Sequence, residues 1–215
     1  MTNPQRTLIA ALLDRSGSMD SIKSDTEGGF NALIAEQRKQ PGEATVTLAQ
    51  FDTEYEVVYA NRPIADVPPL DLQPRSMTAL HDALGRLVTD VGSELAARPE
   101  ADRPGHVIVV VMTDGLENSS VEWTAEAVRA AVKRQEDEYS WNFVFLGANM
   151  DAVAVGQQMG FAPERSMTYD ASAAGVASAV ASTSAYMSRR RAAAPAAVVA
   201  GFSDEDRAGA SGGRR

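Results

Sequence analysis

Three apolar runs constrain the fold of this chain most strongly. They cover residues 7–13, 107–112 and 141–146, and each is bounded by polar residues. Runs this short, rich in Leu, Ile, Val and Phe, are typical of strands buried on both faces of a parallel sheet. Between them lie segments with helical periodicity, so the sequence predicts strands that alternate with helices.

The remaining elements follow from the same patterns. Helical spacing of apolar residues is found in five segments: 19–39, 79–95, 121–138, 151–159 and, more weakly, 171–191. Residues 44–51 and 55–59 predict a strand and its hairpin partner, and residues 167–169 predict a last edge strand. We therefore expect an α/β fold, a three-layer α/β/α sandwich whose central sheet is mostly parallel with one antiparallel edge strand.

Two neighbouring glycines interrupt the first predicted helix. Gly28 and Gly29 each weaken a helix by about 1 kcal/mol relative to alanine. A close packing contact at this point would explain them.

The composition changes near residue 170. Residues 1–170 are expected to form one domain, residues 171–191 an Ala- and Ser-rich helix, and residues 192–215 a flexible tail. Residues 171–215 together hold 6 basic and 3 acidic side chains.

Composition also excludes several classes of site and partner. The 215 residues carry a net charge of −9, which argues against binding to nucleic acid or to an anionic membrane surface. There is no cysteine and there are only two histidines, so disulfides, thiolate sites and multi-histidine metal sites are excluded. We find no secretory signal and no apolar stretch near the ~20 residues that span a bilayer, so we expect a soluble cytoplasmic protein.

Short oxygen-bearing side chains gather where predicted strands end. Asp14, Ser16 and Ser18 follow the first strand, Asp114 follows the strand at 107–112, and Thr78 precedes the helix at 79–95. In a parallel sheet these three loops open on the same edge, so the five side chains are expected to converge.

This set of donors selects a hard cation. All five side chains offer oxygen, which suits Mg²⁺, Mn²⁺ or Ca²⁺ and not zinc or copper. Two carboxylates balance a divalent charge, and the ion then has room for one more anionic oxygen. An Asp or Glu carboxylate of a partner protein is the simplest source of that oxygen.

The pattern resembles the metal-ion-dependent adhesion site (MIDAS) of von Willebrand factor type A (VWA) domains. The resemblance rests on Asp14-x-Ser16-x-Ser18, on Thr78 before a helix, and on Asp114 in Thr-Asp-Gly, within residues 6–170. The surrounding strings are similar to the bacterial intracellular branch of that family. The resemblance implies a Rossmann-like VWA fold, and a metal held directly or through water by Asp14, Ser16, Ser18, Thr78 and Asp114.

One departure from the family is visible. The family often has Gly-Gly or Gly-Ser before the threonine, whereas this chain has Ser76-Met77, which is expected to change the shape of the loop. Near the site, Glu117 and Asn118 are either rim residues or plain loop residues, and His81 either approaches the site or packs elsewhere. Asp and Ser after a strand also cap helices, so an ordinary turn is the alternative reading of the first loop.

No catalytic motif is found. There is no Gly-x-Ser-x-Gly elbow, no phosphate-binding loop and no dinucleotide fingerprint, so we predict no catalytic residues. The preferred hypothesis is a metal-dependent protein-binding module. Two alternatives stay open: a Mg²⁺-dependent hydrolase or phosphatase, and a scaffold with a vestigial metal site whose tail does the binding. The sequence names neither the partner nor the oligomeric state.

Overall fold

The computed structural model describes residues 2–212 and contains one six-stranded sheet with the order β3-β2-β1-β4-β5-β6. The strands are β1 (Asn3–Asp14), β2 (Glu43–Phe51), β3 (Tyr55–Pro63), β4 (Pro104–Thr113), β5 (Asn142–Ala148) and β6 (Ser166–Tyr169). Only the pairing of β2 with β3 is antiparallel, and β3 and β6 are the edges. The predicted sheet is confirmed.

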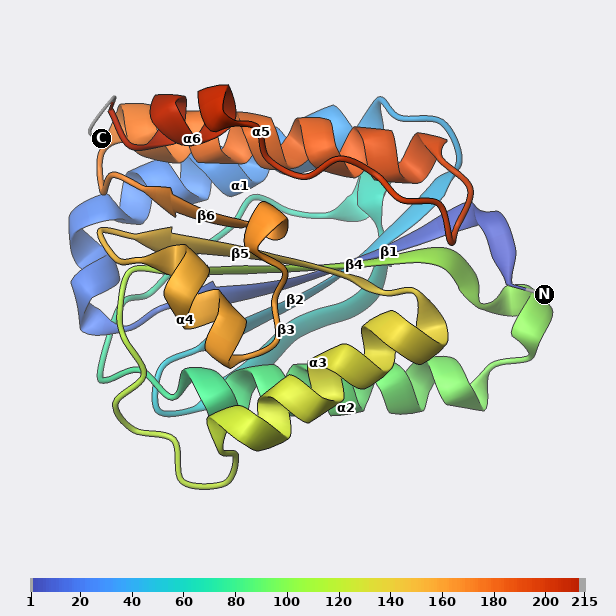
Figure 1. Ribbon diagram of the computed structural model, residues 1–215, viewed down its shortest axis with the longest axis horizontal. Coiled ribbons are helices and arrows are strands. Elements are labelled where there is room, and N and C mark those ends of the chain that lie inside the picture. The colour runs from blue at the N-terminus through green and yellow to red at the C-terminus, as the bar shows by residue number, and fades with distance from the viewer. Residues whose placement is uncertain (1, 213–215) are drawn as a thin grey trace.

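Helices cover both faces of the sheet (Figure 1). The α-helices are α1 (Lys23–Arg38), α2 (Leu80–Ala97), α3 (Ala125–Tyr139), α4 (Ala152–Gln158), α5 (Ala173–Ala192) and α6 (Asp204–Ala210). Helices α1, α5 and α6 share one buried apolar cluster with the sheet, and α2, α3 and α4 share the other. The three-layer α/β/α sandwich is therefore confirmed, and no described helix has the length and apolar character needed to cross a membrane.

The central strand shows why its sequence is continuously apolar. In β1 the side chains of Ile9, Ala11 and Leu13 enter one cluster. Those of Leu8, Ala10 and Leu12 enter the other. Because successive side chains point to opposite faces and helices cover both, every position from Thr7 to Asp14 is buried.

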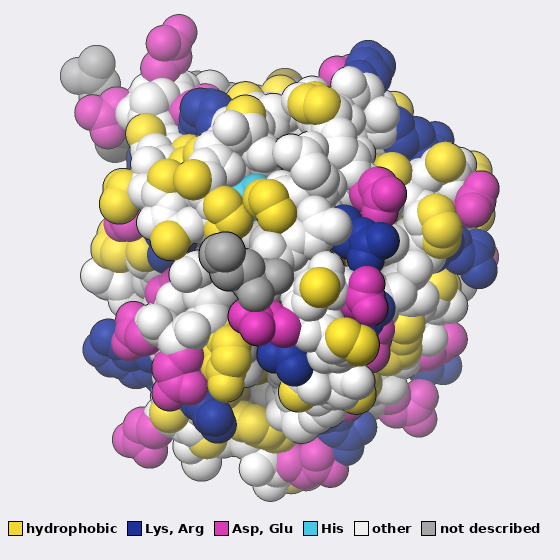
Figure 2. Space-filling view, turned by 90° about the vertical axis from the view of Figure 1, so that its right-hand side faces the viewer, with side chains coloured by type: hydrophobic (Ala, Val, Ile, Leu, Met, Phe, Trp, Pro, Cys, Tyr) yellow, Lys and Arg dark blue, Asp and Glu magenta, His cyan; other side chains and the backbone are white. Residues whose placement is uncertain are grey.

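Strands β1, β4 and β5 all end at the same side of the molecule, at the left in Figure 1. The loops that carry the predicted metal ligands therefore lie together there. Figure 2 looks onto the opposite end, where acidic and basic side chains are intermixed. At that end Arg6 pairs with Glu43 and Asp102.

Two helices begin later than the sequence predicts. The segment predicted as one helix over 19–39 opens with a 3₁₀ turn (Gly17–Ile22), and α1 starts at Lys23. Helix α3 starts at Ala125 instead of residue 121, because the backbone N–H groups of residues 121–123 donate to Asp82 of α2. Thr124 then caps α3 with its hydroxyl.

The C-terminal segment differs from its prediction. Helix α5 packs beside α1 and extends the core, so residues 171–192 continue the fold of 1–170. Within 192–215, predicted as a flexible tail, Phe202 is buried and α6 begins with a capping box between Ser203 and Asp206. Asp170 donates its backbone N–H to the carbonyl of Ala210, which fixes α6 beside β6. Residues 213–215 lie outside the described part.

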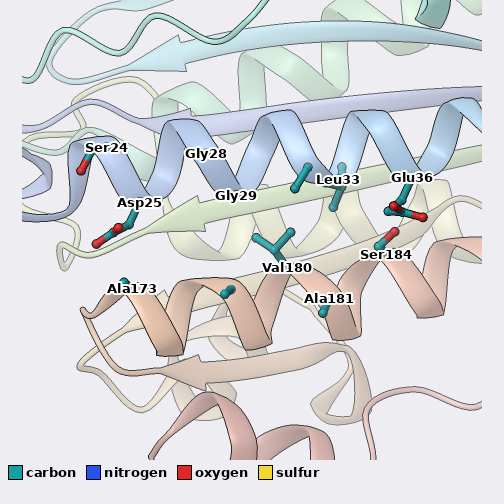
Figure 3. A pocket seen from close by; sticks show the side chains of 12 residues that line it. Ser24, Asp25, Gly28, Gly29, Leu33, Glu36, Ala173, Val180, Ala181 and Ser184 are labelled. Atoms are coloured by element: carbon teal, nitrogen blue, oxygen red, sulfur yellow. The ribbon is translucent and has the colours of Figure 1, made fainter.

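The contact expected at the glycine pair exists at one of the two positions. A methyl group on Gly29 would lie 3.0 Å from Cγ2 of Val180, whereas one on Gly28 would meet nothing within 4 Å. Between α1 and α5 lies an open groove of about 360 Å³ (Figure 3). The missing side chain of Gly29 thus lets α5 approach α1 closely, and both glycines line the groove between the two helices.

Candidate metal site

The first loop begins where β1 ends. The carboxylate of Asp14 accepts the backbone N–H of Ser16 at 2.6 Å, which turns the chain sharply after the strand. Ser16 stands at the N-cap of the 3₁₀ turn, but its hydroxyl makes no capping hydrogen bond. It lies 3.2 Å from the hydroxyl of Ser18. The side chain of Ser16 is therefore directed at its neighbour in the motif and not at the helix end.

The other two loops meet the first. The hydroxyl of Ser18 donates to Oδ1 of Asp114 at 2.7 Å. A methyl group on Gly115 would lie 2.9 Å from Oγ1 of Thr78 and 3.7 Å from both Oδ2 of Asp14 and Oγ of Ser16. The structure thus brings all five predicted side chains together, around the bare backbone of Gly115.

The cluster of five side chains is buried on one side and reaches solvent on the other. Asp14 is 0% exposed, and Ser16 and Thr78 are each 2% exposed. Ser18 is exposed and Asp114 is half-buried. An ion seated among these oxygens would therefore have protein on one side and solvent, or a partner, on the other.

Both carboxylates are shifted toward the neutral form. Burial, with a smaller contribution from the charge of Asp114, raises the pKa of Asp14 to about 6, against the hydrogen bonds from Thr113 and Ser16. Burial also raises the pKa of Asp114, which its bond from Ser18 opposes. A cation beside them would favour the ionised forms, since an opposite charge offsets the cost of burying a carboxylate.

The donor chemistry fits a hard divalent ion. The cluster offers two carboxylates and three hydroxyls, all oxygen. No group of three or more His, Asp or Glu suited to a metal exists among residues 2–212, so a site of the more usual acidic kind is not found there. The residues present would hold Mg²⁺ or a similar ion only through this mixed set.

Thr113 was not among the predicted site residues. Its hydroxyl donates to Oδ2 of Asp14 at 2.5 Å and so orients the most buried carboxylate. Its position could have indicated this role, because Thr113 is the last residue of β4 and directly precedes Asp114. Tyr169 was also missed: its hydroxyl is buried and has no hydrogen-bond partner among residues 2–212, and burial and the charges of Asp114 and Asp14 raise its pKa.

Glu117 and Asn118, which the sequence left as either rim residues of the site or plain loop residues, connect the loop after β4 to neighbouring segments. Glu117 accepts the backbone N–H of His81, Ser119 and Ser120, and Asn118 pairs with Thr78. Because the Glu117 carboxylate meets the first turn of α2, this loop is attached to that helix. His81 lies beside Glu117, with Nδ1 3.8 Å from Oε2, and not among the five oxygens.

The loop before Thr78 contains a residue with a left-handed backbone. Ser76 adopts φ 63°, a left-handed conformation that glycine takes without cost. Its carbonyl accepts the N–H of Gly17 at 3.1 Å, which joins the Thr78 loop to the first loop. The side chain of Met77 is 55% exposed, so its bulk points outward and leaves Thr78 among the other oxygens.

Comparison with known proteins identifies the fold. No family model and no curated protein matches the sequence. Among solved structures, "von Willebrand factor type A from Catenulispora acidiphila" aligns with a TM-score of 0.57 and 16% identity, over 86% of this chain and 43% of that one. The chain has the von Willebrand type A fold.

Two further solved structures are similar to this chain. Proximal thread matrix protein 1 from the mussel byssus, described as having a zinc occupied MIDAS motif, has a TM-score of 0.59 and 13% identity over 85% of this chain. The pilus adhesin SpaC from Lactobacillus rhamnosus GG, in an open conformation, has a TM-score of 0.60 and 13% identity over 86% of this chain. This chain spans 46% and 30% of those two chains, less than half of each.

Proposed function

We propose that this chain is a metal-dependent protein-binding module. A divalent cation, Mg²⁺ or alternatively Mn²⁺ or Ca²⁺, is held by the five-residue set Asp14, Ser16, Ser18, Thr78 and Asp114. The open side of the ion accepts a carboxylate from an Asp or Glu of a partner protein. The cation supplies the positive charge that makes this carboxylate bind.

The observation that carries the proposal is the meeting of three loops around Gly115. Oxygens of Thr78, Asp14 and Ser16 lie within 3.7 Å of the point that a methyl group on Gly115 would occupy, and Ser18 donates to Asp114 beside them. A MIDAS occupied by zinc in a protein of the same fold supports a divalent ion at this position, and leaves the choice of ion to experiment.

The proposal assigns no catalytic step to the chain. Within residues 2–212 neither histidine lies among the five oxygens: His81 contacts Glu117, and His106 is buried in strand β4. A hydrolase using Ser16 or Ser18 as a nucleophile needs a base to take its proton. The alternative of a Mg²⁺-dependent phosphatase predicts turnover of p-nitrophenyl phosphate that is lost in Asp14→Ala.

Titration calorimetry with MgCl₂ and MnCl₂ tests the metal. We expect binding by the intact chain and none by Asp14→Ala, with Asp66→Ala, an exposed aspartate of the 3₁₀ turn at 64–66, as the matched control. Absence of heat for both metals with the intact chain would contradict the proposal.

Affinity capture from the native cells then tests the partner. Capture should require Mg²⁺, be abolished by EDTA and fail with Asp14→Ala. Capture that survives EDTA would favour the scaffold whose tail does the binding. We also propose the bacterial cytoplasm as the compartment, which cell fractionation checks.

A further inference from the structure

Asp52 is a buried carboxylate outside the metal motif. It directly follows β2, in which Phe51 pairs in register with Asp14 of β1. Its side chain is 1% exposed. Asp52 therefore lies at the same edge of the sheet as the five oxygens, one strand away.

Two arginines converge on one oxygen of this carboxylate. Oδ2 of Asp52 accepts Nε of Arg15 at 2.9 Å and Nε of Arg75 at 2.7 Å. Oδ1 accepts the backbone N–H of Glu54 at 2.8 Å. Burial by itself raises the pKa of Asp52, but these partners outweigh it and hold the pKa below its usual value.

Both arginines belong to loops that carry metal-site residues. Arg15 stands between Asp14 and Ser16, and its carbonyl accepts the backbone N–H of Arg75 at 2.7 Å. The carbonyl of Asp52 itself accepts the N–H of Ala79, the residue after Thr78, at 2.8 Å. One residue thus contacts the first loop through Arg15 and both flanks of the Thr78 loop.

We propose that Asp52 is a positioning residue for the metal site, fixing the loop of Ser16 against the loop of Thr78 so that their hydroxyls face one cation. The inference rests on the proposed function, because it needs a cation at the five oxygens. Asp52 does not contact those oxygens itself. It acts through Arg15, Arg75 and the N–H of Ala79.

A stabilising ion pair alone does not account for this arrangement. Buried ion pairs add little net stability, since desolvation costs about as much as their attraction returns. The Arg15 side chain is 7% exposed, and its Nη2 has no hydrogen-bond partner within the described residues. One donor of the Arg15 guanidinium is therefore left unpaired. What the ion pairs achieve is to hold the loop of Ser16 against the loop of Thr78.

The test compares Asp52→Asn with Glu43→Gln. Both changes turn a carboxylate into an amide, at or next to strand β2, but Glu43 is 75% exposed and pairs with Arg6 at the far end of the sheet. Mn²⁺ binding is followed by the loss of the free-ion EPR signal, well below the unfolding temperature. We expect Asp52→Asn to bind Mn²⁺ about 10- to 100-fold more weakly, and Glu43→Gln to bind it unchanged.

A readout specific to positioning is the EPR spectrum of the bound ion. Misaligned hydroxyls change its coordination symmetry, so the bound Mn²⁺ spectrum of Asp52→Asn should differ from that of the intact chain. A purely structural role would lower the unfolding temperature in EDTA and leave both affinity and spectrum unchanged in the folded protein. That result would overturn the inference.

A second variant covers the case in which Asp52→Asn does not fold. Arg75→Met removes a side chain that is 53% exposed, so the fold should survive, and Mn²⁺ affinity should fall severalfold. If the intact chain binds Mn²⁺ and these variants match Glu43→Gln, the inference is wrong and the proposed function stands. If the intact chain binds neither Mn²⁺ nor Mg²⁺, the proposed function and the inference are both wrong.

Discussion

Asn118 and Thr78 hold each other by two hydrogen bonds. The backbone N–H of Thr78 donates to Oδ1 of Asn118 at 3.0 Å, and the N–H of Asn118 donates to the carbonyl of Thr78 at 3.0 Å. Forty residues separate them in the sequence. The loop after β4, which carries Asp114, is thereby attached to the loop that carries Thr78.

Removing the side-chain half of this pair should weaken metal binding. Asn118→Ala leaves the N–H of Thr78 without its acceptor, and we expect Mg²⁺ affinity by calorimetry to fall by about 10-fold. Asn118→Asp keeps the acceptor oxygen, so its affinity should stay near that of the intact chain. Equal affinities for the alanine variant and the intact chain would show that the pair does not position Thr78.

A second attachment joins the same loop to α2. Asp82 accepts the backbone N–H groups of Val121, Glu122 and Trp123 at 2.7–2.9 Å. Asp82→Asn has one acceptor oxygen in place of two, and we expect it to lower the free energy of unfolding by about 1–3 kcal/mol at pH 7 in urea titrations.

The pH dependence of this variant follows from the pKa of Asp82. Burial raises that pKa, but the three N–H donors outweigh burial and hold it below 3.8. The ionised carboxylate therefore stabilises the folded state at pH values above 3.8, and this contribution is lost as pH falls through the lowered pKa. The difference between the intact chain and Asp82→Asn should shrink below pH 3.8; a constant difference would contradict this account.

Replacing serine by glycine should change the stability in opposite directions at left-handed and at helical positions. Ser76 and Ser140 have φ 63° and 56°. Ser76→Gly and Ser140→Gly should each raise the free energy of unfolding by about 0.5–1 kcal/mol, because glycine adopts this conformation without the steric cost. Ser24→Gly, at an exposed position in α1, should lower it by about 0.5–1 kcal/mol. Thermal unfolding of the three variants checks the signs.

The elements that the sequence predicts best are those whose burial is uniform. Strands β1, β4 and β5 were predicted because helices cover both faces of the sheet, so each strand contains a continuous apolar run. The meeting of Asp14, Thr78 and Asp114 was also predictable, since parallel strands end at one edge. The parallel arrangement of the strands is enough to bring these motif residues together.

The contacts that hold the site were not predictable in the same way. Asp52, Asp82 and Asn118 bind backbone groups or arginines that lie 23–41 residues away, and no local pattern marks such a partner. Helix α6 is a different case. Ser203 and Asp206 form a capping box whose Ser-x-x-Asp spacing is readable, but the Ala- and Gly-rich composition around it favoured a tail.

His106 should make the protein sensitive to mild acid. It is 1% exposed in β4, and burial together with the positive charges of Arg190 and Arg191 on α5 lowers its pKa from 6.5 to about 4, against the carbonyl of Pro4. The unfolded chain therefore takes up a proton near pH 6.5, whereas the folded chain does so only near pH 4. The contribution of neutral His106 to the free energy of unfolding is fully present above pH 6.5. It is lost as the pH drops through this window, by up to about 3 kcal/mol.

His106→Gln isolates this contribution, because glutamine stays neutral over the whole range. Urea titrations from pH 7 down to pH 4 should show a smaller loss of unfolding free energy in the variant than in the intact chain. His81→Gln is the control, since His81 lies in α2 near Glu117 and away from the two arginines. Equal slopes for the intact chain and His106→Gln would mean that His106 takes up its proton in the folded protein as readily as in the unfolded chain.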